Sequence, residues 1–335
     1  MFDPVSRQRL FGYDQAFEHP VTCWVSVTLV VLMLLSFVIC GLMGKTGKLS
    51  PESRRELRAR NTTWAVLIPL MLLPILAGAF WTMLGVFALS LLCYREYARA
   101  TGLFREYITS AVVVVGIAFI SFAVLDNWYA FFMALSALGT VFVVAFTVLP
   151  DRPEGYIQRS ALGIFAFMFF GFGLGHLGFM ANTPDYRPIV LLILFAVEFN
   201  DVAAFIWGKM LGRRKLAPRT SPGKSIAGAL GALVSTTVLV VGLGSFVFAG
   251  SEMAHPIRLI GLGLIISVAG QLGDLVMSSI KRDLGLKDIG HTLPGHGGIL
   301  DRFDSLLLVA PAVFHYVGYW KHFGLAQPLR ILSGG

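Results

Sequence analysis

Charged residues are concentrated near the carboxy-terminal end of the sequence, between segments that are otherwise apolar. The stretch from Asp274 to Asp304 reads DLVMSSIKRDLGLKDIGHTLPGHGGILDRFD. Asp274, Ser278, Lys281 and Arg282 are spaced i, i+4, i+7 and i+8, so a helix would place them on one face. A carboxylate in an apolar helix is costly unless it is paired, bound to a metal or in contact with water. We therefore predict that Asp274 either binds a metal ion or forms an ion pair with Lys281 or Arg282.

A glycine-rich turn follows, from Pro294 to Gly298, and leads into a predicted helix that begins with Asp301, Arg302 and Asp304. The backbone N–H groups of such a turn, together with the helix dipole, favour an anion. An acidic first turn can simply complement the dipole. That explanation accounts for one aspartate, but not for the whole Asp-Arg-Phe-Asp sequence.

Together, these side chains supply both kinds of charge that phosphate chemistry requires. The cations are Lys281, Arg282, Lys287 and Arg302, and the carboxylates that can hold a divalent metal are Asp274, Asp301 and Asp304. Phosphoryl and nucleotidyl transfer depend on positioning and charge neutralisation, and Mg²⁺ binds through carboxylates together with substrate phosphates. Zinc is not expected, because no cysteine is near and His291 and His296 are not spaced as a ligand pair.

A second polar cluster begins with Glu198 and Asp201 near the end of an apolar segment. A basic loop follows and ends in the sequence SPGKS, immediately before the next apolar segment. This sequence lacks the first glycine and the full spacing of a Walker motif. Lys224 and Ser225 remain candidates for binding phosphate because they precede a predicted helix. The alternative is that the loop only orients the protein in a membrane.

The elements that must position these clusters are long apolar segments. The chain has 335 residues, of which 56% are hydrophobic and 14% are charged, whereas about 25% are charged in a typical soluble domain. A helix crosses a bilayer with about 20 apolar residues. We predict ten segments, at residues 21–43, 63–77, 79–94, 107–125, 128–149, 160–181, 188–207, 226–249, 257–280 and 299–319. The second and third are short, so we expect a hairpin or a re-entrant pair around Gly78.

The net charge of +8 lies in short loops between the apolar segments. It therefore indicates membrane topology and not binding to nucleic acid. With ten segments, five basic loops fall on one side, at residues 44–61, 95–106, 150–159, 208–225 and 281–298. By the positive-inside rule this side is cytoplasmic and both termini lie outside. Both polar clusters would then open to the cytoplasm, where nucleotides are available.

The motif residues resemble those of one known family, the phosphatidate cytidylyltransferases (CDP-diacylglycerol synthases). The match to the family signature runs without a gap from Ser278 to Asp304. The matching residues are Ser278, Ile280, Lys281, Arg282, Lys287, Asp288, Leu293, Pro294, His296, Gly297, Gly298, Ile299, Asp301, Arg302, Phe303 and Asp304. An upstream element is similar in Asp201, Trp207, Gly208, Leu211, Gly212, Lys215, Leu216, Pro218, Ser221, Pro222 and Lys224.

The resemblance implies transfer of CMP from CTP to phosphatidate, giving CDP-diacylglycerol and pyrophosphate. It also implies Mg²⁺, with or without a monovalent cation such as K⁺, and a homodimer in the cytoplasmic (inner) membrane. The metal would be held by Asp274, Asp301 and Asp304. The other implied catalytic residues are Lys281, Arg282, Lys287, Asp288, His296 and Arg302, and the implied substrate-binding residues are Asp201, Lys215, Ser221, Lys224, Ser278, Gly297 and Gly298.

We therefore expect an all-α, polytopic integral membrane protein with about nine or ten transmembrane helices. It would form one integral domain over residues 1–335. Residues 1–185 would supply the amino-terminal helices, and residues 186–320 the catalytic region with cytoplasmic loops 201–225 and 281–304.

Two alternatives to this function remain open. Ala227 stands where the family commonly has a glutamate, so the acceptor could instead be another lipid phosphate of the polyprenyl type, in a cytidylyltransferase or a kinase reaction. A more distant alternative is a transporter that uses Glu198, Asp201 and Asp274 as intramembrane carboxylates. A transporter would place functional polar groups on both sides of the membrane, whereas these clusters lie on one side.

Overall fold

A computed structural model describes residues 4–45, 50–290, 292–293, 297–324, 328 and 330–334 of the chain. As predicted, these residues form helices almost throughout, with one two-stranded sheet among the part that is described. Within that part, eight helices are long and apolar enough to cross a membrane. The protein is therefore a multi-pass membrane protein of the all-α class.

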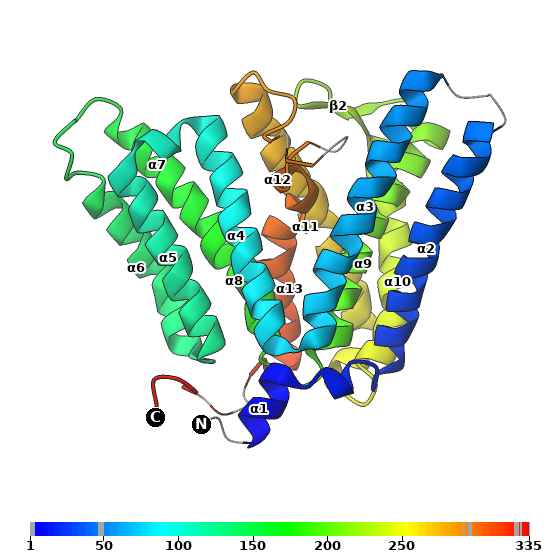
Figure 1. The fold of residues 1–335 in the computed structure, drawn as a ribbon, viewed down its shortest axis with the longest axis horizontal. Coiled ribbons are helices and arrows are strands. Elements are labelled where there is room, and N and C mark those ends of the chain that lie inside the picture. Colours follow the sequence, from blue (N-terminus) through cyan, green and yellow to red (C-terminus); the bar gives the residue numbers. More distant parts are fainter. Residues whose placement is uncertain are drawn as a thin grey trace.

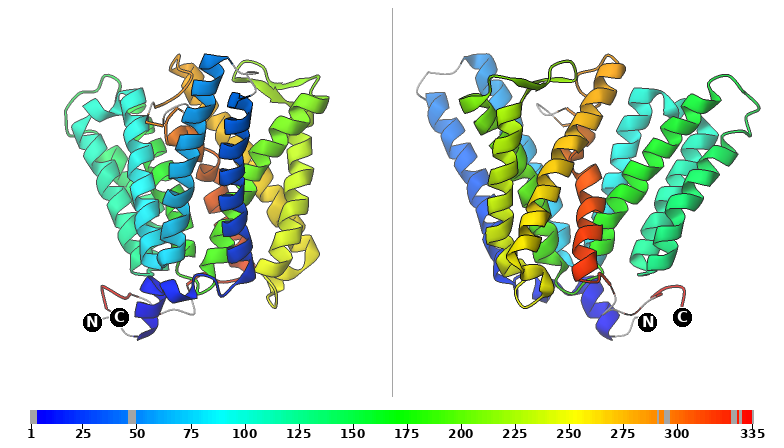
Figure 2. Two further views of the ribbon diagram at one scale, coloured as in Figure 1. Left: turned by 45° about the vertical axis from the view of Figure 1, so that its right-hand side comes forward. Right: turned by 180° about the vertical axis from the view of Figure 1, so that it is seen from behind.

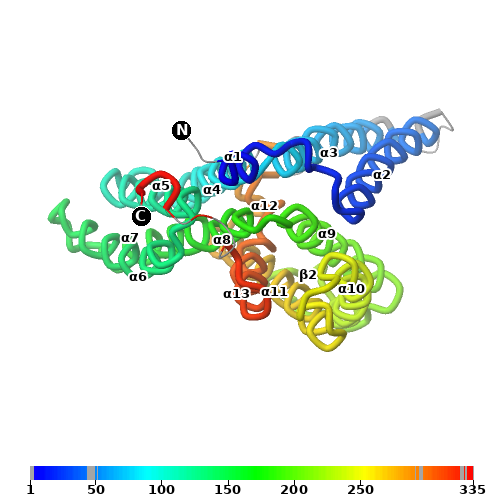
Figure 3. The backbone as a smooth tube through the Cα atoms, turned by 90° about the horizontal axis from the view of Figure 1, so that it is seen from below, coloured from blue at the N-terminus to red at the C-terminus, as the bar shows by residue number. Residues whose placement is uncertain are grey.

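The long helices run between two ends of the molecule and spread apart toward one of them, which gives the ribbon a V shape (Figure 1). The elements are α1 (Pro4–Phe11), α2 (Pro20–Lys45), α3 (Pro51–Ala77), α4 (Ala79–Thr101), α5 (Tyr107–Leu125), α6 (Tyr129–Phe146), α7 (Tyr156–Ala166), a π-helical segment (Phe167–Gly173), α8 (Leu174–Met180), α9 (Tyr186–Leu211), β1 (Lys215–Ala217), β2 (Ser221–Ser225), α10 (Ile226–Val247), α11 (Pro256–Asp283), α12 (Leu300–Phe303) and α13 (Leu306–Trp320). Helices α5 to α7 form one arm, and α2, α3, α9 and α10 form the other (Figures 1 and 3).

Successive helices alternate in direction, as the predicted topology requires. The carboxy-terminal ends of α2, α4, α6, α9 and α11 lie together at the top of Figure 1, whereas α1 and the last described residues lie at the opposite end. Figure 2 shows the same arrangement from two other directions. We call the first end the loop face, because the five predicted basic loops belong to it. Its assignment to the cytoplasm stays a prediction.

Helices α3 and α4 extend beyond the second and third predicted apolar segments. Ser50 caps α3 by accepting a hydrogen bond from the backbone N–H of Ser53 at 3.1 Å, so the charged residues that follow are helical. Helix α4 likewise continues to Thr101. Between the two helices, Gly78 has a φ of 137°, which favours glycine. The expected hairpin is confirmed, and the re-entrant alternative is wrong because both helices have full length.

The last predicted segment, 299–319, is not one continuous helix. It is divided at Asp304 and Ser305 into the short α12 and the longer α13. A Cβ atom on Gly273 would lie 2.7 Å from the carbonyl oxygen of Asp304, so this glycine lets α11 contact the break closely. The predicted single helix was therefore wrong, and the interruption brings Asp304 against α11.

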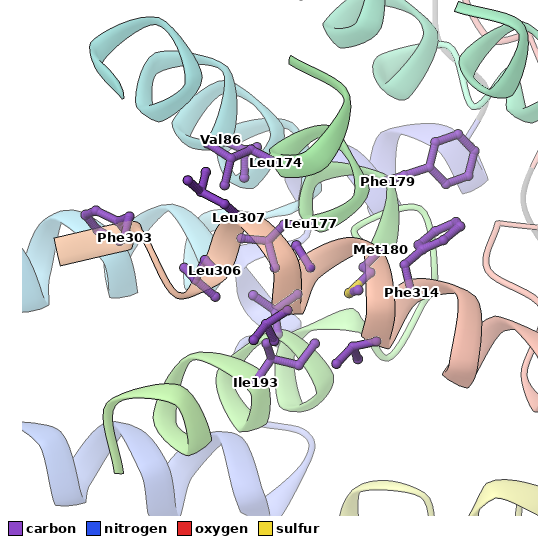
Figure 4. Close-up of a cluster of buried hydrophobic side chains, with 14 of the residues drawn as sticks. Val86, Leu174, Leu177, Phe179, Met180, Ile193, Phe303, Leu306, Leu307 and Phe314 are labelled. Atoms are coloured by element: carbon purple, nitrogen blue, oxygen red, sulfur yellow. The ribbon is translucent and has the colours of Figure 1, made fainter. Parts of the chain in front are cut away.

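A hydrophobic core holds this interrupted segment in place. The side chains labelled in Figure 4 come from α4, α8, α9 and the α12–α13 segment. Phe303, Leu306 and Leu307 are 7%, 3% and 1% exposed. In a membrane such contacts stabilise mainly through close packing. Packing of these side chains on both sides of Asp304 therefore fixes the α12–α13 break within the helix bundle.

Candidate active site

Asp274, on α11, has two polar neighbours. Ser278 Oγ donates to Asp274 Oδ1 at 3.1 Å, one helical turn away, as the spacing predicted. Lys224 Nζ, on β2, lies 2.5 Å from Asp274 Oδ2. The expected ion pair with Lys281 or Arg282 was wrong, because the β1–β2 hairpin places Lys224 over Asp274 while Lys281 turns toward α12.

Asp301 is enclosed by three donors, and its side chain is 3% exposed. Lys281 Nζ lies 2.9 Å from Asp301 Oδ1. The backbone N–H groups of Ile289 and Gly298 donate to Oδ2 at 3.0 and 2.9 Å. Hydrogen bonds to a charged group are stronger than neutral ones. Asp301 therefore connects Lys281, near the end of α11, with Ile289 and Gly298 in the segment between α11 and α12.

Four acidic side chains from three parts of the fold, Asp274 among them, lie within electrostatic range of one another. We call them the carboxylate cluster: Glu198 and Asp201 on α9, Asp274 on α11 and Asp304 at the α12–α13 break, with Lys224, Lys281 and Arg302 as neighbouring cations. Carboxylates of like charge repel unless cations neutralise them. Charged groups at membrane depth are expensive and typically functional. The tertiary fold thus joins the two polar clusters of the sequence into one site.

The β1–β2 hairpin forms the second wall of the site. Besides the Lys224 pair, the carbonyl oxygen of Thr220 accepts a hydrogen bond from Arg282 Nε at 3.3 Å. Ser225 Oγ accepts from the backbone N–H of Gly228 at 3.1 Å and thereby caps α10. Ser225 therefore fixes the hairpin to the start of a helix, so it has a structural role in addition to any contact with phosphate.

No role was predicted for Glu96 from the sequence. Glu96 lies near the carboxy-terminal end of α4 and is 6% exposed. Its Oε1 accepts hydrogen bonds from Thr292 Oγ1 at 2.5 Å and from the backbone N–H of Ile299 at 3.0 Å. Its Oε2 accepts from the backbone N–H of Leu300 at 2.8 Å. The only sequence signal was an acidic residue at the end of an apolar segment, between Arg95 and Tyr97.

These contacts change the interpretation of the glycine-rich turn. The backbone N–H groups of Gly298, Ile299 and Leu300 donate to Asp301 and Glu96. They are therefore not free to bind a phosphate, as the turn-and-helix pattern had suggested. Among the described residues, these three N–H groups are therefore occupied by carboxylates of the protein.

The remaining predicted residues lie around this centre. Lys287 and Arg302 are exposed, and a Cβ atom on Gly297 would lie 3.2 Å from Asp288 Oδ1. Lys215 pairs with Ser225, and Ser221 with Ala217, within the hairpin. Neither Lys215 nor Ser221 makes a hydrogen bond or ion pair with the carboxylate cluster among the residues that the structure describes. His296 lies outside the described residues.

The donor set suits Mg²⁺ in its chemistry, since the carboxylate cluster offers the hard oxygen ligands that this ion prefers. The described ranges contain no group of three His, Cys, Asp or Glu residues already placed to hold a metal ion. Lys224 and Lys281 instead neutralise Asp274 and Asp301. Of the Asp301 oxygens, Oδ2 accepts two backbone N–H groups, whereas Oδ1 contacts Lys281.

An apolar groove with a volume of about 200 Å³ ends beside the site. Its walls come from α3, α4 and α9, and Ile299 and Phe303 line it next to Asp301. The hydroxyl of Thr82, which also lines the groove, donates to the carbonyl oxygens of Pro74 and Gly78 and so presents no free donor. The charged site and the groove therefore meet at α12.

Comparisons with known proteins identify the family to which the chain belongs. The family model described as "Cytidylyltransferase family" matches residues 58–320. A phosphatidate cytidylyltransferase of Staphylococcus aureus (strain COL) is 33% identical over 255 residues, covering 75% of this chain and 95% of the relative. Another, from Staphylococcus haemolyticus, is 32% identical over 262 residues with the same coverage. The uncharacterized protein YnbB of Escherichia coli (strain K12) is 30% identical over 265 residues, covering 77% of this chain and 86% of that protein.

Proposed function

Because the chain belongs to the cytidylyltransferase family and is a nucleotidyltransferase, we propose that it transfers CMP from CTP to phosphatidate. The products would be CDP-diacylglycerol and pyrophosphate. The observation that carries this proposal is the contact at α12 between the charged site and the apolar groove. A lipid phosphate needs these two surfaces side by side, one for its charged group and one for an acyl chain.

In the proposed reaction, an oxygen of the lipid phosphate attacks the α-phosphorus of CTP. A new P–O bond forms there while the bond to the β-phosphate oxygen breaks, and pyrophosphate leaves. A phosphomonoester has a second pKa of about 6 and is largely ionised at neutral pH, so the attack needs no strong general base. The protein's task is to position the reactants and to neutralise charge.

The basic side chains would perform that task by exchanging partners. Lys224 and Lys281 are paired with Asp274 and Asp301. When the triphosphate enters, these lysines turn to phosphate oxygens, and the carboxylates lose their counter-charges. Arg282, Lys287 and Arg302 are exposed and would complete the phosphate contacts.

Mg²⁺ is part of the proposal, with Asp274, Asp304 and Asp301 Oδ1 as its ligands. The ion would neutralise the triphosphate and the departing pyrophosphate. The exchange of partners releases Asp274 Oδ2 and Asp301 Oδ1, the two oxygen atoms that the lysines contact. A monovalent cation such as K⁺ and a homodimer belong to the same proposal, as does a location in the cytoplasmic membrane with the site facing the cytoplasm.

The direct test is a product analysis. The detergent-solubilised protein is incubated with labelled CTP, Mg²⁺ and a panel of lipid phosphates that contains phosphatidate and polyprenyl phosphates. We expect CDP-diacylglycerol and an equal amount of pyrophosphate. A labelled product from polyprenyl phosphate alone would replace phosphatidate as the acceptor, and release of CDP in place of pyrophosphate would indicate a kinase.

A further inference from the structure

Glu96 connects the amino-terminal half of the chain to the charged segment near its other end. It lies on α4, and its three recorded donors are Thr292 and the backbone N–H groups of Ile299 and Leu300. All three donors are uncharged. They lie on both sides of the glycine-rich turn, so one buried carboxylate holds the two ends of the turn together.

The bonds of Glu96 alternate along the chain with those of Asp301. Ile289 and Gly298 donate to Asp301, whereas Thr292, Ile299 and Leu300 donate to Glu96. A displacement of the turn from Glu96 would therefore also move the two backbone N–H groups that orient Asp301.

Two glycines allow the Glu96 carboxylate to come so close. A Cβ atom on Gly290 would lie 2.6 Å from Glu96 Oε1, and one on Gly298 would overlap Glu96 Oε2. Glycine is the residue that permits such close approach of the backbone. Gly290 and Gly298 therefore leave room for a carboxylate of the protein itself.

We propose that Glu96 is a positioning residue for the transfer reaction: it holds the turn so that Asp301 and Lys281 keep their catalytic geometry. Among the described residues, the hydrogen bonds of Glu96 go to Thr292, Ile299 and Leu300 and not to the carboxylate cluster, so Glu96 acts through Asp301. This role rests on the proposed function, but the geometry that it requires can be measured without any turnover.

The central test compares Glu96→Gln and Glu96→Asp with the wild-type protein. Glutamine keeps one acceptor oxygen and places an NH₂ group against a backbone N–H, whereas aspartate keeps both oxygens on a shorter side chain. We expect Glu96→Gln to lower kcat at least tenfold while the KM for CTP changes less than twofold, and Glu96→Asp to recover part of kcat. Glu56→Gln is the matched control, because Glu56 is an exposed partner of Arg60 on α3.

Hydrogen exchange measures how firmly the backbone at Ile299 and Leu300 is held. It therefore distinguishes a positioning role of Glu96 from an effect on folding stability and from a direct catalytic role. In Glu96→Gln, the peptide that contains Ile299 and Leu300 should exchange at least tenfold faster, with the melting temperature within a few degrees of wild type. Unchanged exchange and kcat would overturn the proposal. A loss of kcat that only follows a loss of folded protein would also overturn it.

Two further variants keep the test decisive if Glu96→Gln does not fold. Gly298→Ala disturbs the contact from the other side, and Thr292→Val removes one donor; both should speed exchange in the same peptide and lower kcat. If both leave these quantities unchanged, Glu96 has no positioning role. A wild-type protein that modifies no lipid phosphate would refute the proposed function, while the exchange data would still decide whether Glu96 holds the turn.

Discussion

At the scale of single residues, the site consists of carboxylates that are already paired with cations or backbone donors. Asp274 contacts Lys224, and Asp301 contacts Lys281 and two backbone N–H groups. Such pairs neutralise charge at membrane depth, where an unpaired carboxylate is costly. They also give the site a supply of cations that can move to an incoming triphosphate.

Asp301→Asn tests the most enclosed of these pairs. Asparagine removes the charge that Lys281 and a bound Mg²⁺ would contact, and we expect turnover to fall about 100-fold, which corresponds to about 2.7 kcal/mol of transition-state stabilisation. Turnover is measured with labelled CTP at several Mg²⁺ concentrations. Asp283→Asn is the control, since Asp283 is exposed at the end of α11. Near-normal turnover with an unchanged Mg²⁺ dependence would remove Asp301 from the catalytic residues.

Lys224→Gln tests the exchange of partners. The Lys224 and Asp274 side chains are 23% and 26% exposed, so solvent screens this ion pair more than the Lys281–Asp301 pair. We expect the KM for CTP to rise about tenfold, which corresponds to 1.4 kcal/mol of binding, with a smaller fall in melting temperature than for Asp301→Asn. Arg213→Gln, on the same exposed loop, should leave the KM unchanged. An unaltered KM for Lys224→Gln would mean that this lysine does not contact the nucleotide.

At the scale of elements, four pieces of the chain build the site: α9, the β1–β2 hairpin, α11 and the α12–α13 break. Small residues and caps permit some of the close approaches, such as Gly273 against Asp304 and Ser225 at the start of α10. The α3–α4 hairpin adds the groove and Glu96. The amino-terminal helices therefore contribute directly to the site.

Gly85→Leu tests whether the groove on α3 and α4 receives an acyl chain. A Cβ atom on Gly85 would lie 3.5 Å from Pro74 Cβ, an ordinary contact, so a leucine can be accommodated while filling the groove. We expect kcat/KM to fall about tenfold, or 1.4 kcal/mol, for dioleoyl phosphatidate and to change little for dioctanoyl phosphatidate. Gly242→Leu, at an open position of α10, is the control. An equal effect on both lipids would argue against a role of the groove in chain binding.

At the scale of the whole molecule, the alternating helices collect the basic loops and the charged site at the loop face (Figure 1). The apolar exteriors of the helices face away from the site, and exposed leucines and valines are numerous on α2, as expected for a surface in contact with lipid. The arrangement agrees with an enzyme that takes a soluble nucleotide from one side of the membrane.

The sidedness can be measured with single cysteines. Cys23, Cys40 and Cys93 are first replaced by alanine, and Arg213→Cys and Ala249→Cys are introduced separately at exposed positions on the loop face and the opposite end. By the positive-inside rule, a membrane-impermeant thiol reagent should label Ala249→Cys in intact cells and Arg213→Cys only after permeabilisation. The reverse pattern would place the site outside the cytoplasm.

Much of the protein was predictable from the sequence alone, for physical reasons that operate along the chain. Apolar runs long enough to cross a membrane predicted helices, and the positive-inside rule predicted that the basic loops between them lie on one side of the membrane. The helical spacing of Asp274 and Ser278 placed them in contact. The charged motif also identified the family, because its residues are contiguous and their order needs no knowledge of the fold.

Only the tertiary structure decided which charges meet. Lys224 pairs with Asp274 across 50 positions of sequence, and Glu96 reaches Leu300 across 204. No helical or strand period connects residues so far apart, so their pairing depends on how α4, α11 and the hairpin pack. The same packing interrupted the last helix at Asp304 and placed Glu96 and Asp301 against the backbone N–H groups of Gly298, Ile299 and Leu300. These described N–H groups, which the sequence suggested for phosphate, thus hold carboxylates of the protein.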